Sequence, residues 1–76
     1  MEYDEDKIDE MVLALLWLGR HEECRVWKSH DWDAMDRLHA RGYISDPQSK
    51  AKSVVLPEAG ERRSRELFER HFTPKV

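Results

Sequence analysis

Apolar residues recur at helical spacing near the start of the chain and predict a helix from Asp6 to Leu18. Acidic residues occupy its first turn, where they oppose the positive end of the helix dipole. One buried stripe is predicted to contain Ile8, Met11, Val12, Leu15, Leu16 and Leu18. Leu13 and Trp17 fall on the other side of the helical wheel, where a surface helix is normally polar. This second apolar face is covered either by later segments of the chain or by a second copy. Leu13 and Trp17 are therefore the candidate self-association residues.

A second helix is predicted from Trp32 to Arg41, between a capping residue and a glycine. Asp31 can accept a hydrogen bond from the helix N-terminus, and Gly42 can take the left-handed conformation that ends a helix. With Gly42 in that conformation, Tyr43 falls where a Schellman motif packs an apolar residue back onto Leu38. The residues predicted to point inward are Trp32, Met35, Leu38 and His39.

The remaining chain predicts a hairpin and a third helix. Short strands at 43–45 and 53–56 flank a polar turn, and Pro57 suits the first turn of a helix that continues to Phe72. Acid-before-base pairs at i, i+4 are predicted along this helix, namely Glu58 with Arg62, Glu61 with Arg65 and Glu66 with Arg70. Residues 19–30 show a weaker pattern, in which residues 22–26 could form a short helical turn.

These elements predict a single domain over residues 1–76, with frayed ends at 1–5 and 73–76. Its class is mainly α with a small β-hairpin (α+β), built from three main helices and two antiparallel strands. A chain of 76 residues forms only a small core, so we expect either a dimer or a marginally stable monomer. No apolar run reaches the roughly 20 residues of a membrane span, and the acidic start is unlike a secretory signal. The single cysteine, Cys24, favours a cytoplasmic setting.

Charge is divided unevenly between the two halves of the chain, although the formal net charge is only -3. Residues 1–36 hold eleven acids and four bases, which gives -7, whereas residues 37–76 hold five acids and nine bases, which gives +4. Either the two halves neutralise each other when they pack, or the second half presents a basic face to nucleic acid. The candidate nucleic-acid contacts are Arg37, Arg41, Lys50, Lys52 and Arg63.

Motifs of the common enzyme classes are absent from the sequence. There is no Gly-rich phosphate loop, no G-x-S-x-G and no H-E-x-x-H. His21 and Cys24 have the spacing of two metal ligands on one helical turn, but a structural zinc site needs four ligands. The sequence therefore predicts a protein that is not an enzyme and that has no catalytic residue, metal or cofactor.

The segment from Leu38 to Ile44, followed by a polar loop and the segment from Ser53 to Gly60, resembles the winged helix-turn-helix of MarR-like and PadR-like regulators. The resemblance covers residues 35–68 and implies a winged-helix-like fold. It also implies that the helix at 32–41 would be the recognition helix, with Lys50 and Lys52 on the wing. The sequence departs from the pattern at Asp33 and Asp36, which would repel a duplex, and at Pro57, where Thr is usual.

Near its start the chain carries Tyr-Asp-Glu-Asp-Lys-Ile at 3–8, and it carries Asp-Trp-Asp at 31–33. With these segments, the whole chain is also similar to a family of small uncharacterised bacterial proteins to which no activity is assigned. Together these observations predict a winged-helix-like module for protein interaction or dimerisation, with a homodimer expected and a further protein partner possible. The alternative is a DNA-binding transcriptional regulator that uses the wing and the helix at 32–41. No membrane partner is expected.

Overall fold

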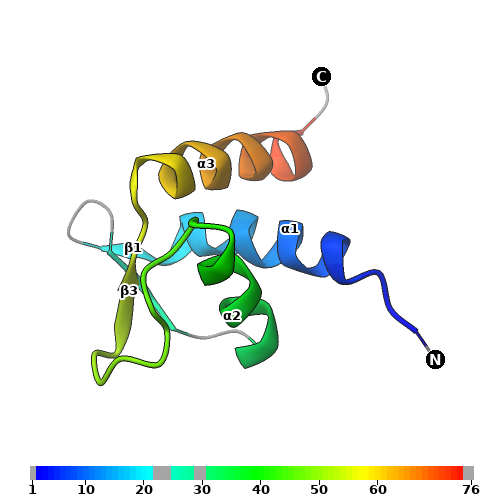
Figure 1. Ribbon diagram of the computed structural model, residues 1–76. Coiled ribbons are helices and arrows are strands. Elements are labelled where there is room, and N and C mark those ends of the chain that lie inside the picture. The colour runs from blue at the N-terminus through cyan, green and yellow to red at the C-terminus, as the bar shows by residue number, and fades with distance from the viewer. Residues whose placement is uncertain (1, 22–24, 29–30, 75–76) are drawn as a thin grey trace.

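The computed structural model describes residues 2–21, 25–28 and 31–74. Its helices are α1 (Glu5–Leu16), α2 (Trp32–Ala40) and α3 (Glu58–Phe72), and a short 3-10 turn, η1 (Trp17–Gly19), follows α1. The strands are β1 (Arg20–His21), β2 (Arg25–Trp27) and β3 (Ser53–Val55). Figure 1 shows α1 between α3 and α2, with the sheet at the end of α1 farthest from the N-terminus. The predicted class, mainly α within an α+β fold, is confirmed.

The first helix begins at Glu5 because Asp4 caps it, its side chain accepting a hydrogen bond from the Lys7 backbone N–H at 3.0 Å. Its predicted end at Leu18 lies inside η1, where the chain tightens after Leu16. Among the helices in the described part of the chain, none has the length and apolar character needed to cross a bilayer.

The predicted ends of α2 are confirmed by their hydrogen bonds. Asp31 accepts from the Ala34 backbone N–H at 3.1 Å, and Gly42 has a φ of 82°. Gly42 donates its N–H to the His39 carbonyl at 2.9 Å, and Tyr43 donates to the Leu38 carbonyl at 3.0 Å. These two bonds define a Schellman motif, and Tyr43 packs against the core as the sequence predicted.

The inward face of α2 is only partly as predicted. Met35 and Leu38 are buried, together with Ala34, but Trp32 is 55% exposed and His39 is also exposed. Trp32 is the first residue of the helix, before the buried stripe reaches the core. His39 instead places its Nδ1 atom 3.1 Å from the Ile44 carbonyl, beside the Schellman turn.

The predicted hairpin of residues 43–45 with 53–56 is wrong in its pairing. The strand at Ser53–Val55 forms, but it pairs antiparallel with β2, which also pairs with β1. Residues 43–45 are not a strand. Ser45 still contacts β3, because its backbone N–H donates to the Val55 carbonyl at 2.9 Å and its Oγ, in place of its carbonyl, accepts the Val55 N–H at 2.8 Å. The predicted helical turn at 22–26 is also corrected, since Arg25 and Val26 belong to β2 and residues 22–24 lie outside the described residues. The two-stranded wing is thus replaced by a three-stranded sheet, and a winged helix is not established.

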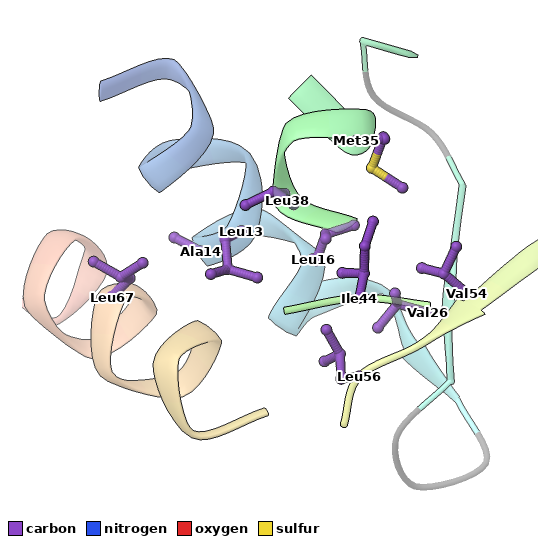
Figure 2. Packing of buried hydrophobic residues seen from close by; sticks show 10 residues of the cluster. All are labelled: Leu13, Ala14, Leu16, Val26, Met35, Leu38, Ile44, Val54, Leu56 and Leu67. Carbon is purple, nitrogen blue, oxygen red and sulfur yellow. The ribbon is translucent and has the colours of Figure 1, made fainter. Parts of the chain in front are cut away.

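The core lies where α1, α2, α3 and the sheet meet (Figure 2). It consists of Leu13, Ala14, Leu16, Val26, Met35, Leu38, Ile44, Val54, Leu56 and Leu67. Leu13 was expected on an outer face but is 1% exposed, because α3 covers that side of α1 and Ser64 Oγ donates to the Leu13 carbonyl at 2.7 Å. Later segments of the same chain therefore bury this part of the second apolar face. Ile8 and Leu18, predicted to be buried, are exposed.

Helix α3 approaches the loop after α2 through a glycine. Gly60 is buried against the backbone of Tyr43, and a Cβ at this position would overlap the Tyr43 carbonyl oxygen and lie 2.7 Å from its carbonyl carbon. Only a residue without a side chain fits this contact. Gly60 therefore fixes the distance between the start of α3 and the Schellman turn.

Candidate functional site

A cleft of about 320 Å³ lies at the junction of the three helices, and we call it the ionic cleft. The fully buried leucines Leu13, Leu38 and Leu67 line it together with Tyr43. Its charged lining residues are Asp4, Asp6, Lys7, Asp9, Glu10, Arg41 and Arg63. Binding sites are commonly clefts in which a few polar groups converge, so the contacts of these charges decide what the cleft can do.

The strongest contact beside the cleft joins α1 to α2. Asp9 is 1% exposed and accepts from Arg37 Nε at 2.8 and 3.0 Å and from Arg37 Nη2 at 2.7 Å. Glu5 accepts from Arg37 Nη1 at 3.2 Å. The hydrogen bonds to Asp9 raise the pKa of Arg37 above its ordinary value, so the guanidinium stays charged. This side chain thus neutralises a buried carboxylate and is committed to the fold.

Two further bases are held by acids of α1. Arg41 Nη2 lies 2.7 Å from Asp6 Oδ1, and this hydrogen bond raises the pKa of Arg41. Arg63 on α3 lies 3.8 Å from Glu10 Oε1 and 3.5 Å from Glu66 on its own helix. Three of the five predicted nucleic-acid contacts therefore carry ion pairs with acidic residues.

Glu10 is the acid that connects α1 to α3. It accepts from Lys7 Nζ at 3.3 Å and lies 3.8 Å from Arg70. His71 Nε2 is 3.5 Å from Glu10 Oε2, within ion-pair distance but without a hydrogen bond. The hydrogen bond from Lys7 is the largest cause that holds the pKa of Glu10 below its ordinary value of 4.5, and the charges of Lys7, His71 and Arg70 act in the same direction.

The lowered pKa of Glu10 predicts a loss of stability in acid. A carboxylate with a depressed folded-state pKa contributes stability that is complete above its ordinary pKa and disappears as pH falls through the folded value. We therefore expect the melting temperature of the wild type to decrease as the pH is lowered below about 4.5. The melting temperature of Glu10→Gln should decrease less steeply over the same range. Melting curves between about pH 3 and pH 7 measure this difference. Parallel pH profiles for the two proteins would contradict it.

The predicted pairs along α3 are not the ion pairs that form. Arg70 reaches Glu10 on α1, and Arg63 pairs with Glu66 at i, i+3. In residues 2–21, 25–28 and 31–74, Arg62 and Arg65 make no ion pair. Acids of the first half and bases of the second half therefore largely pair where α1 packs against α2 and α3. This agrees with the first interpretation, in which the two halves neutralise each other.

The two remaining candidate contacts, Lys50 and Lys52, lie elsewhere. Both are exposed on the loop that leads into β3, and neither lines the ionic cleft. The five predicted bases thus divide into a group engaged with α1 and a pair beside the sheet. The start of α2, which would face a duplex, also carries Asp31 and Asp33.

Trp17, the other candidate self-association residue, lies in a surface region that we call the η1 corner (Trp17, Leu18 and Arg20). Trp17 is half-buried, and the Arg20 guanidinium lies 3.3 Å above the centre of its ring while donating to the Trp17 carbonyl at 3.1 Å. Leu18 is 67% exposed. This corner contacts both α3 and β2, so it is a fixed part of the fold.

A further aromatic pair lies on the outer face of the sheet and was not predicted. Trp27 is 51% exposed, and its ring stacks on His21 with 3.9 Å between centroids and 20° between planes. Alternation along β2 turns Val26 into the core and Trp27 outward. The weak pattern of residues 19–30 hid these short strands, so the sequence offered no signal for the stack.

The H-x-x-C pair of the sequence does not form a site that can be described, because Cys24 lies outside the described residues. His21 is occupied by the stack with Trp27. Among residues that the structure does describe, no group of three or more His, Cys, Asp and Glu could hold a metal ion.

Comparison with known proteins places the chain in a family. A protein of Sinorhizobium fredii named "Uncharacterized protein y4hR" is 62% identical over 73 residues, which cover 96% of this chain and 99% of that protein. No solved structure matches the chain. The predicted similarity to a small uncharacterised bacterial family is thus confirmed. Residues 4–74, from the cap of α1 to the end of α3, match the family described as Domain of unknown function (DUF6429), and the chain belongs to it.

Proposed function

We propose that this chain is a non-catalytic interaction module that pairs with a second copy of itself through the η1 corner. The observation that carries the proposal is Leu18, a large aliphatic side chain that is 67% exposed on a rigid turn beside Trp17. Trp and Arg are the residues most enriched among those that dominate binding energy at protein interfaces. Trp17 and Arg20 provide both, within three residues of Leu18.

The absence of catalysis is proposed from the contacts in the ionic cleft. A catalytic acid or base must be free to exchange a proton with a substrate. Here Asp9 is held by Arg37, and Asp6 is held by Arg41. Glu10 bridges to α3 through Arg63 and Arg70. These ion pairs join α1 to α2 and α3, so the charged groups stabilise the fold and are not free to act on a substrate.

The geometry of the corner favours a symmetric dimer. In a two-fold dimer the same patch on each copy meets its equivalent. An apolar residue at the centre of that patch therefore packs against its counterpart, and the side chains of both copies become buried. Leu18 can occupy that centre, and the planar guanidinium of Arg20, which lies over the Trp17 ring, supplies a flat neighbour. Leu13 cannot take part in this surface because it is buried under α3.

Leu18→Glu is expected to convert a dimeric sample into monomers, because it places two carboxylates against each other at the centre of the interface. Sedimentation velocity over a range of protein concentrations measures the change. Leu18 is preferred to Trp17 for this test because its exposed side chain contributes little to the core.

Tyr3→Glu is the matched control, since Tyr3 is 71% exposed and precedes α1, whereas the η1 corner follows the other end of that helix. This variant should sediment as wild type does. A wild-type chain that stays monomeric at every concentration would overturn the proposal, and so would a dimer that Leu18→Glu leaves intact.

A further inference from the structure

We propose that the outer face of the sheet is a binding site for single-stranded nucleic acid, on which Trp27 stacks a base and Lys50 and Lys52 bind phosphate. We call this face, made of His21, Trp27 and Ser53 with the adjoining loop lysines Lys50 and Lys52, the sheet platform. The sheet platform shares no residue with the η1 corner, although that corner contacts β2, and binding to it does not require self-association.

The strand register assembles the aromatic part of the platform. Val26 pairs with Val54 on the core side of the sheet, whereas Trp27 pairs with Ser53 on the outer side. The small Ser53 leaves the indole 51% exposed, and the stack on His21 holds the ring at a fixed angle. A pre-oriented aromatic ring on a sheet surface is the common means of stacking unpaired bases.

The loop before β3 brings the basic part close to Trp27. Lys28 directly follows Trp27, and its backbone N–H donates to the Lys52 carbonyl at 3.1 Å. The Lys28 side chain donates from Nζ to the Ser49 carbonyl at 2.7 Å, which fixes the other side of the same loop. Lys50 lies between these two anchored residues. The loop lysines are therefore held at the end of β2 that carries Trp27.

The charges on this part of the molecule favour an anion. Lys50 and Lys52 are exposed and make no ion pair within the described ranges, in contrast to Arg37 and Arg41. Asp46 is the acid in the loop, and it accepts from the Gln48 backbone N–H at 2.8 Å. The sequence also places Glu22 and Glu23 between β1 and β2, outside the described residues.

A single strand fits this surface better than a duplex does. Stacking on Trp27 requires an unpaired base, because the bases of a duplex are already stacked on one another. Asp31, which caps α2, and Asp33 in its first turn follow Lys28 closely in sequence, and their charges would repel the second strand of a duplex. The chemistry therefore points to unpaired nucleotides.

Fluorescence anisotropy of a labelled oligothymidine of about 12 nucleotides, titrated with the full chain at about 50 mM and 200 mM salt, tests this site. Trp27→Ala should weaken binding about tenfold, as expected for the loss of one stacked base. The double variant Lys50→Glu/Lys52→Glu should weaken binding and reduce the slope of log K against log salt by at least about 1.4.

Two matched controls separate the platform from general effects. Trp32→Ala removes a tryptophan of similar exposure, 55%, from α2, and Arg62→Glu/Arg65→Glu makes the same charge change on α3. Both should bind as wild type does, and melting curves should confirm that all four variants are folded. Should Trp27→Ala not fold, the lysine variant and its control still decide the result. The proposal is overturned by no binding at the lower salt, by equal weakening in the controls, or by a duplex competitor that binds more tightly.

Discussion

Gly60→Ala is expected to lower the free energy of unfolding by about 3 kcal/mol, which is a large part of the stability of so small a domain. The added methyl group would overlap the carbonyl oxygen of Tyr43, and this oxygen belongs to the backbone, so no rotamer change can relieve the contact. Either α3 or the loop after α2 must move. That movement would open the core, to which α3 contributes Leu67 and the loop after α2 contributes Ile44.

The other two glycines provide graded controls for this prediction. Gly42 has open space around its Cα but a φ of 82°, so Gly42→Ala should cost about 1 kcal/mol for the left-handed conformation. A Cβ on Gly19 would lie 3.9 Å from its nearest neighbour, the Trp27 backbone nitrogen, so Gly19→Ala should have little effect. Urea denaturation of the three variants measures their free energies of unfolding, and the loss should be largest for Gly60→Ala and smallest for Gly19→Ala. Equal effects at Gly60 and Gly19 would contradict the close approach of α3.

Arg37→Met is expected to lower the melting temperature by about 15 °C, because it leaves the buried carboxylate of Asp9 without its cation. Methionine keeps most of the aliphatic packing of the arginine stem, so the loss reports mainly on the charge. Glu5→Gln is the control, because Glu5 contacts the same guanidinium but lies on the surface. Exposed pairs contribute little, so this variant should melt within a few degrees of wild type.

The double variant Asp9→Leu/Arg37→Met makes the test sharper. When both charges are replaced by apolar residues of similar volume, no buried charge is left unpaired and most of the stability should return. Thermal melting of the two single variants and the double variant forms a double-mutant cycle. A double variant less stable than Arg37→Met alone would show that the pair is not the cause of the loss.

The parts of the fold that could be predicted depend on neighbours in sequence. Asp31 and Gly42 mark the ends of α2 because capping and the Schellman motif involve residues only a few positions apart. The start of α1 and the extent of α3 follow from similar local signals. These features need no knowledge of which segments pack together.

The sheet could not be predicted because its pairing is set by contacts between distant segments. Two strands of two and three residues leave almost no alternation to detect, and Val26 meets Val54 across 28 positions of the chain. The segment at 43–45 has strand-like residues, yet the Ser45 hydroxyl accepts the Val55 N–H that a second strand would need. The segment therefore contacts β3 at Ser45 without forming a strand, and β2 pairs with β3 on the other side.

For the candidate site, the sequence predicted which charges each half of the chain carries but not which of them pair. The sequence showed an acidic first half and a basic second half, but the partners of Arg37 and Arg70 are 28 and 60 positions away, on α1. Pairing rules within one helix therefore gave the wrong partners for α3. Trp17 stays a prediction that rests on its position off the buried stripe, whereas Leu13 was misplaced because α3 covers more of α1 than one stripe suggests.

In the proposed dimer, Trp17 and Leu18 meet a second copy of the chain, and Trp32 stays free of that contact. The three indole N–H signals in a nitrogen-correlated NMR spectrum report on these positions separately. Over a dilution series, we predict that the Trp17 signal shifts while the exposed Trp32 signal stays in place. A Trp17 signal that does not move with concentration, or a shift of Trp32 without one of Trp17, would contradict the proposed interface.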